Sequence, residues 1–220
     1  MATKKSLVTR EKIVSMYMDS TLEHNAKPVS VYHFAKDNNF TEAEFYQFFG
    51  NLEIIEKVIF DMFFNKTIEL LEKNSDYKSY DMKNKIISFY FTFFELLTAN
   101  RSYVVMTLKQ HQNQLKNMMI LKDFRKKFKN YAADIITDDF RTKQERFQEF
   151  QEKTTTESFW FQFLLTLKFW LDDESASFEK TDLYIEKSVK ATFELMNITP
   201  IDSLIDFGKF IFKEKIYSKS

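Results

Sequence analysis

Hydrophobic residues recur every three or four positions through the first 73 residues, which predicts a series of amphipathic helices. A Lys-Pro step at 27–28 and an Asn pair at 38–39 interrupt this pattern, because proline breaks helices and asparagine tolerates a left-handed turn. Ser30 and Thr41 are predicted N-caps, and Glu44 completes a capping box with Thr41. The expected helices cover residues 9–23, 30–37, 41–48 and 52–71.

The helical spacing resumes after a polar stretch at residues 74–80, so the rest of the chain is also predicted to be helical. Asp81 is the expected N-cap of the next helix. Thr199-Pro200 is a start signal for the last one, since proline is favoured at the first helical position. The expected helices cover residues 81–99, 102–115, 121–137, 138–153, 156–171, 181–196 and 199–216.

Composition supports an all-α fold. The 220 residues include only two glycines and two prolines, too few for the turns of a sheet protein. There is no cysteine, which excludes disulfides, thiol catalysis and cysteine-ligated zinc. The three histidines lack metal-ligand spacing, and the chain has no nucleophile elbow and no glycine-rich loop. We therefore expect no enzyme activity, no metal and no cofactor.

The chain has no net charge that would attract it to nucleic acid or a membrane, because 32 lysines and arginines balance 32 aspartates and glutamates. The start of the sequence leads into no apolar signal core. The longest charge-free stretch near the apolar peaks, residues 158–167, is ten residues long, whereas a membrane span needs about 20. These features predict a cytoplasmic protein with no membrane partner.

The two short helices expected at 30–37 and 41–48, joined by a tight polar turn, form a helix-turn-helix pattern. Residues 31–49 resemble the DNA-binding head of TetR-family transcriptional regulators. The positions that carry this resemblance are Phe34, Ala35, Thr41, Ala43, Phe45, Tyr46 and Phe49. The resemblance implies an N-terminal three-helix head at residues 1–52, which binds DNA, and a larger helical body at 53–220, which binds a ligand and dimerises.

As a TetR-like regulator, the chain is expected to bind palindromic operator DNA as a homodimer, as a repressor, and to respond to an apolar small molecule. Basic and polar side chains of the arm and the helix-turn-helix are the candidate DNA contacts. They are Lys4, Lys5, Arg10, Ser30, Thr41, Glu42, Tyr46 and Gln47.

Two departures from the family pattern leave an alternative open. Leu52 stands where the family commonly has a phosphate-binding lysine, and residues 1–73 carry nine basic and eleven acidic side chains, a net charge of −2. DNA affinity depends largely on neutralising phosphates with cations. The alternative is a protein of the same fold that binds a lipid or isoprenoid and does not bind DNA.

Aromatic residues crowd the body and surround its helices instead of forming a single stripe. Helices of this kind are buried on more than one side, so we expect a subunit interface or a ligand cavity beside the core. Ordinary core packing is the alternative explanation for part of the set. The candidate pocket residues are Phe89, Phe93, Met106, Phe163 and Trp170.

Overall fold

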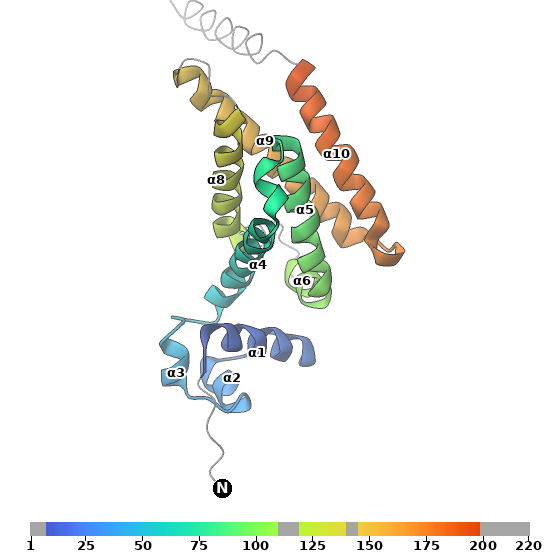
Figure 1. Ribbon diagram of the computed structural model, residues 1–220. Coiled ribbons are helices and arrows are strands. Elements are labelled where there is room, and N and C mark those ends of the chain that lie inside the picture. Colours follow the sequence, from blue (N-terminus) through green and yellow to red (C-terminus); the bar gives the residue numbers. More distant parts are fainter. Residues whose placement is uncertain (1–7, 110–118, 140–144, 199–220) are drawn as a thin grey trace, which may run out of the picture. The chain divides into compact units, whose positions relative to one another are not determined.

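The computed structural model describes residues 8–109, 119–139 and 145–198, and every regular element among them is a helix (Figure 1). The all-α prediction is therefore confirmed. Contacts within the chain define two compact units. The described residues of Met1–Leu70 and Phe93–Lys127 form the first unit, and those of Leu71–Thr92 and Phe128–Ser220 form the second. The predicted division into a head at 1–52 and a body at 53–220 stays a prediction.

The first unit begins with four helices, and the second and third start directly after the predicted caps Ser30 and Thr41. The Thr9 side chain accepts a hydrogen bond from the Lys12 amide, and Ser30 accepts one from the His33 amide. The third helix is shorter than expected, because it ends at Tyr46 with Gln47 as its C-cap. The four helices are α1 (Arg10–Glu23), α2 (Val31–Asp37), α3 (Glu42–Tyr46) and α4 (Glu53–Lys73).

An aromatic cluster holds α1, α2, α3 and the start of α4 together. The rings of Phe34 and Phe45 are both fully buried and meet edge to face, with centroids 6.3 Å apart. Tyr17 of α1 meets Phe34 in the same way at 5.9 Å. Aromatic pairs of this geometry contribute about 0.5–1.5 kcal/mol each beyond the burial of their area. Helices of five and seven residues are not stable alone, so this cluster is what fixes α2 and α3.

A buried ion pair joins the loop after α1 to α4. The Lys27 ammonium lies 2.5 Å from an oxygen of Glu56, whose side chain is 8% exposed. The hydroxyl of Tyr17 donates a hydrogen bond of 3.2 Å to the same oxygen. Burial and the negative charge of Glu56 raise the pKa of Tyr17, so this phenol stays protonated and remains a donor. The ammonium of Lys27 and the hydroxyl of Tyr17 together offset the cost of removing the Glu56 carboxylate from water.

The remaining elements confirm most of the predicted helices. Residues 75–79, predicted as linker, form a short 3-10 helix. Residues 145–172 form one continuous helix where two were predicted, because no proline or glycine interrupts the charged stretch before Thr156. The predicted helix at 199–216 lies outside the described residues. The elements are η1 (Ser75–Ser79), α5 (Met82–Ala99), α6 (Arg101–Lys109), α8 (Lys122–Asp139), α9 (Glu145–Asp172), η2 (Ala176–Phe178) and α10 (Glu179–Ile198).

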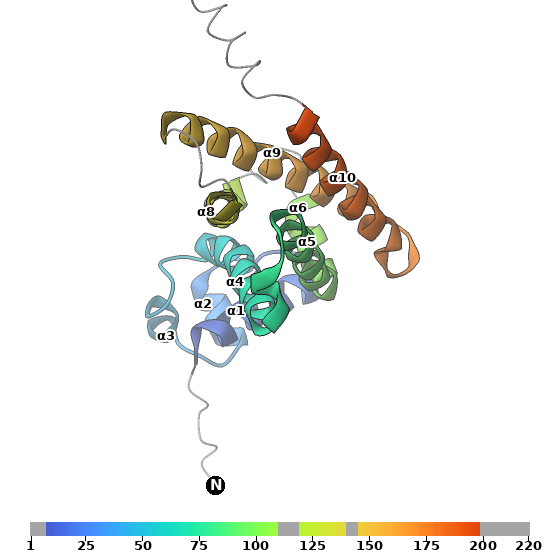
Figure 2. The ribbon, with the colours of Figure 1, turned by 45° about the horizontal axis from the view of Figure 1, so that its top comes forward.

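In the second unit, α9 and α10 pack against each other as a hairpin (Figure 2). Asp173, directly after α9, holds the turn between the two helices through hydrogen bonds. One carboxylate oxygen accepts hydrogen bonds from the amide and hydroxyl of Ser175, at 2.9 and 2.7 Å. The other accepts from the amide and hydroxyl of Thr181, at 3.0 and 2.6 Å. These four bonds hold a turn in which Ser177 and Phe178 both adopt positive φ, a strained conformation for a phenylalanine.

These hydrogen bonds of Asp173 predict a pH-dependent contribution to stability. Burial raises the pKa of Asp173, but the hydrogen bonds from Thr181 and Ser175 outweigh it and lower the pKa from 3.8 to about 2. The folded state therefore favours the ionised form. Its contribution is complete above about pH 4 and is lost as the pH falls through about 2.

Replacing Asp173 with asparagine leaves one amide donor facing the donors of Thr181. We expect the variant to be less stable at pH 7 by about 1–3 kcal/mol, the cost of one orphaned buried group. Urea unfolding followed by circular dichroism checks this. The difference between wild type and D173N should shrink between pH 4 and pH 2, and a difference independent of pH would contradict the assignment.

Candidate functional site

In the helix-turn-helix, Phe45 packs the inner face of α3 into the aromatic cluster. Phe45 is completely buried and also contacts Phe49, with ring centroids 5.7 Å apart. The turn before α3 contains Asn39 at φ 58°, a conformation that asparagine adopts more readily than most residues. α2 and α3 therefore pack as a rigid pair, and the outer face of α3 is presented to solvent.

The outer face of α3 carries three of the predicted DNA contacts. Tyr46 is 55% exposed, and Glu42 and Gln47 are also exposed. Gln47 follows the last helical residue as the C-cap, so its amide lies at the C-terminal end of this face. A phenol, an amide and a carboxylate side by side can donate and accept hydrogen bonds at phosphates or base edges.

The other predicted contacts are distributed around the helix starts. Ser30 and Thr41 cap α2 and α3, so their hydroxyls already accept backbone hydrogen bonds. The guanidinium of Arg10 lies 5.7 Å from the centre of the Phe49 ring, a cation–π contact that positions it at the start of α1. Lys4 and Lys5 lie outside the described residues.

Glu44 has a different role from Glu42. Its carboxylate turns back on the helix start and accepts from the amide and the hydroxyl of Thr41, both at 2.7 Å. This confirms the predicted capping box and places the charge of Glu44 beside the backbone amides of α3, not on its outer face.

Sequence reasoning missed an exposed aromatic residue on α2. Tyr32 is 54% exposed, and the ammonium of Lys36 lies 5.9 Å from its ring centre. Val29, just before the α2 cap, is 91% exposed. The alternation of Tyr32 with the buried Phe34 was the available signal, because residues two apart point to different sides of a helix.

The predicted pocket residues fall into two groups. Phe89, Phe163 and Trp170 are completely buried in the second unit, where Phe89 and Phe163 both contact Phe128, at 5.3 and 5.5 Å. Phe93 is buried in the first unit. Met106 is partly buried and lines an open groove. Whether these residues surround a ligand stays a prediction.

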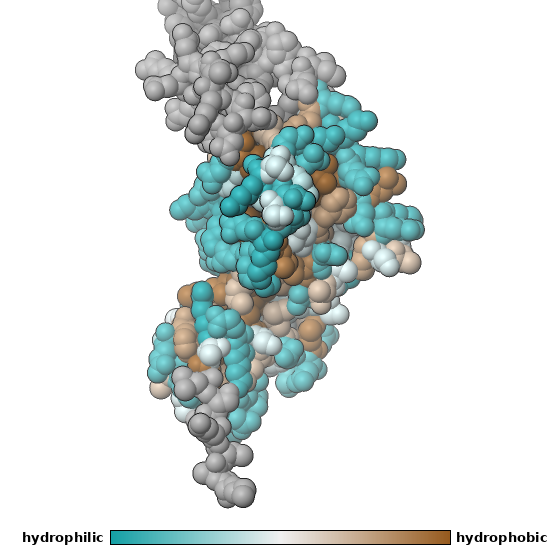
Figure 3. Space-filling view, viewed as in Figure 1, coloured by the Kyte–Doolittle hydropathy of each residue, from teal (hydrophilic) through white to brown (hydrophobic). Residues whose placement is uncertain are grey.

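An apolar stripe reaches the surface on α9. Phe161, Leu165 and Phe169 follow one another at intervals of four residues and are 63%, 40% and 36% exposed. Leu183 of α10, 48% exposed, continues the apolar surface. In the space-filling view, hydrophobic residues interrupt the hydrophilic surface in the region of these two helices (Figure 3).

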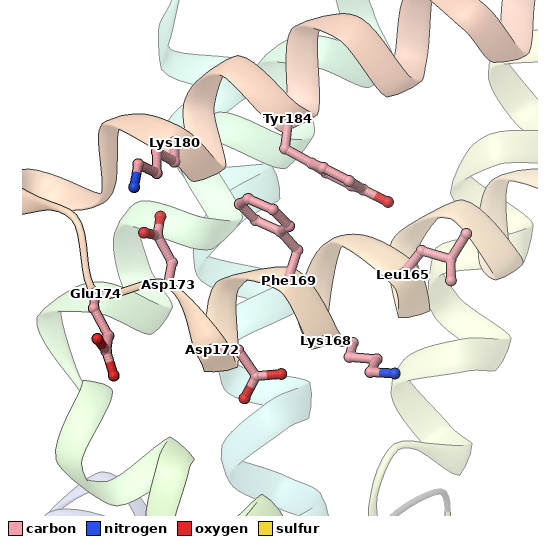
Figure 4. Close-up of a pocket in the computed structure, with 8 residues that line it drawn as sticks. All are labelled: Leu165, Lys168, Phe169, Asp172, Asp173, Glu174, Lys180 and Tyr184. Carbon is pink, nitrogen blue, oxygen red and sulfur yellow. The ribbon is translucent and has the colours of Figure 1, made fainter.

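A groove of about 560 Å³ lies between the end of α9 and the start of α10 (Figure 4). The rings of Phe169 and Tyr184 stack across it, with centroids 4.5 Å apart and planes 15° from parallel. Lys168, Asp172 and Lys180 surround this apolar centre. The groove therefore combines an apolar centre with a charged rim.

Within the described part of the chain, no group of three or more histidine or acidic side chains is placed to hold a metal ion. No helix in these same ranges is both long enough and apolar enough to cross a membrane.

Comparison with known proteins connects these features. A family model described as "Tetracyclin repressor-like, C-terminal domain" matches residues 85–211, more than half of the chain. The crystal structure of the TetR transcriptional regulator from Nitrosomonas europaea ATCC 19718 superposes with a TM-score of 0.58. The alignment covers 83% of this chain and 96% of that chain at 14% sequence identity, so this likeness concerns the fold. No curated protein matches the sequence.

The capping box makes the position of α3 sensitive to one hydroxyl. Replacing Thr41 with alanine removes the acceptor for the Glu44 amide, and we expect a loss of about 1 kcal/mol in the free energy of unfolding. Replacing Thr41 with serine keeps the hydroxyl and serves as the matched control. Denaturant unfolding followed by circular dichroism measures both, and equal stability of the alanine and serine variants would contradict the role of the cap.

Proposed function

Because this chain belongs to the TetR family of transcriptional regulators, we propose that it is a homodimeric repressor that binds palindromic operator DNA and responds to an apolar small molecule. The observation that carries the DNA-binding part is the outer face of α3. Its exposed side chains stand on a helix that buried Phe45 and the Thr41 capping box hold in place. A rigid support of this kind is what a base-reading surface requires.

In the proposed complex, α3 enters the major groove and the first turns of α1 and α2 face the phosphates. Gln47 is the candidate base reader, because its amide can form a pair of hydrogen bonds with adenine. Tyr46 can reach a phosphate or a thymine methyl group. Arg10, with Lys4 and Lys5 in the arm, supplies cations to the backbone.

Few cations of the head are available to neutralise phosphates, so we expect phosphate contacts to contribute little to its DNA affinity. The ammonium of Lys27 is engaged with the buried Glu56, so this cation is less available to DNA. The carboxylate of Glu44 is held at the helix start, which leaves Glu42 as the acidic side chain on the outer face. A carboxylate there repels phosphates and can accept a hydrogen bond from cytosine.

The apolar surface of α9 and α10 is the proposed dimer interface. The body of TetR-like regulators pairs two C-terminal helices of each subunit in a four-helix bundle. Phe161, Leu165 and Leu183 expose apolar area that a monomer would leave in water. The completely buried Phe163 and nearly buried Leu167, in contrast, belong to the core of the unit itself.

Response to an effector follows as linkage in this proposal. A ligand that binds one conformation of the dimer more tightly shifts the population toward it and so changes the affinity for DNA, and DNA changes the affinity for the ligand by the same factor. The aromatic surroundings of the body favour an apolar ligand.

The net-acidic head supports a second candidate function, binding of a lipid or isoprenoid without DNA. Leu52 and the net charge of −2 over residues 1–73 are the observations that favour it. Retention of DNA by the purified protein separates the two candidates.

DNA retention should depend on the predicted residues in distinguishable ways. Replacing Gln47 with alanine should cost about 1–3 kcal/mol on the specific site and little on other sequences. Replacing Lys4, Lys5 and Arg10 with alanine should weaken binding to every sequence alike and make the log–log salt slope shallower by about 0.9 per lost phosphate contact. Fluorescence anisotropy on fragments of the gene's own upstream region, at several salt concentrations, measures both effects.

Replacing Glu42 with glutamine should raise non-specific affinity, since a repulsive charge leaves the outer face of α3. Glu23→Gln, an exposed carboxylate near the end of α1, is the matched control. If wild type shows no site-specific retention at low salt and E42Q gains nothing, the repressor proposal is wrong and the lipid-binding candidate replaces it.

The dimer interface should break when charge is placed on the exposed stripe. We expect wild type to sediment at twice the chain mass of 26.5 kDa at micromolar concentration. The double variant Leu165→Glu with Leu183→Glu should sediment as a monomer, because two carboxylates would be buried in an apolar contact. Leu70→Glu replaces an equally exposed leucine on α4 and should remain dimeric. A wild-type monomer would contradict the interface.

A further inference from the structure

A second groove lies beside α6, and neither the DNA surface nor the α9–α10 surface uses it. It has a volume of about 660 Å³, within the range typical of small-molecule sites, and it is open to solvent. Five of its lining residues come from α6 and one from the turn after α1. They are Arg101, Ser102, Val105, Met106, Lys109 and Asn25.

The lining of this groove has a positive charge at each end and an apolar middle. Arg101 and Lys109 mark the two ends of α6, eight residues and therefore about 12 Å apart along the helix. Val105 and Met106, both partly buried, form the apolar middle. Among the described residues that line the groove, two carry positive charge and none carries negative charge.

We propose that this groove binds an anionic amphiphile, a small molecule with a carboxylate or phosphate group and an apolar chain. The anionic group would pair with Arg101 or Lys109, and the chain would cover Val105 and Met106. A methionine suits a variable chain, because its flexible thioether adapts to different shapes. Ser102 and Asn25 add a hydroxyl and an amide that can orient the anionic group.

The groove also lies next to the packing that positions the helix-turn-helix. α6 packs against α1, and Tyr103 of α6 is buried in the same cluster as Phe34 and Phe45. A ligand that shifts α6 would therefore act on the support of α3 through directly packed side chains. This regulatory consequence rests on the proposed DNA-binding function, whereas the binding site itself does not.

Binding can be measured on the full-length protein with dodecanoate and dodecyl phosphate, each below its micelle concentration. Isothermal titration calorimetry should show saturable binding of one or both, and the one that binds identifies the anionic group. Neutral 1-dodecanol and cationic dodecyltrimethylammonium should bind at least about tenfold more weakly, since they cannot pair with the two cations.

The double variant Arg101→Gln with Lys109→Gln should lose about tenfold or more in affinity for the anionic probe. Arg125→Gln with Lys126→Gln, an adjacent arginine and lysine exposed on α8, is the matched control and should bind as wild type does. Unfolding midpoints confirm that all the variants are folded. Loss of affinity in the control, or equal binding of the neutral and cationic probes, would overturn the proposal.

The location is tested with a dodecanoate that carries a diazirine on its chain. Photolabelling followed by trypsin and mass spectrometry should modify the peptide of residues 102–109. Labelling confined to peptides that contain Phe89 or Phe163 would place the ligand in the aromatic core and overturn this site.

DNA retention provides the last measurement. Dodecanoate should change the operator affinity of wild type and not that of the Arg101→Gln, Lys109→Gln variant. If the anionic probe binds in the groove and DNA affinity stays constant, the site stands and its regulatory consequence fails. If the double variant loses DNA affinity without any probe, Arg101 and Lys109 contribute to DNA affinity directly and the regulatory consequence fails.

Discussion

Burial of large aromatic side chains is the constraint on which this structure depends. The chain contains 26 phenylalanines, and the two short helices α2 and α3 each bury one of these rings, Phe34 and Phe45. α3 has five residues, fewer than two helical turns, and the burial of Phe45 holds it in place. Because Phe45 fixes the inner face of α3 against the cluster, the opposite face with Tyr46 is exposed to solvent.

Much of this arrangement is predictable from the sequence. The side chains that begin helices are local signals, so Ser30 and Thr41 were predicted correctly as caps. Helix ends are less visible. α3 stops at Tyr46 although its apolar pattern continues to Phe49, because Phe49 packs back on Phe45 from outside the helix.

The sequence also does not reveal which face of a helix is buried when apolar residues occur on every side. In α9 aromatic residues occur on several sides, so spacing could not distinguish the buried Phe163 from the exposed Phe161. The direction of Glu44, in contrast, was predictable, because a glutamate three residues after a threonine cap completes a capping box. The groove beside α6 depends on residues 25 and 101 coming together, which no local pattern contains.

The ion pair of Lys27 with Glu56 has a consequence for how this protein can be dissected. Glu56 and the buried Ile55 and Ile59 belong to α4, yet they complete the packing around α1 and α2. A fragment that ends at residue 52 would leave Lys27 without its carboxylate and open the aromatic cluster to water. The smallest portable form of this head is therefore a four-helix piece, and a chimera that grafts it onto another body must carry the first turns of α4 with it.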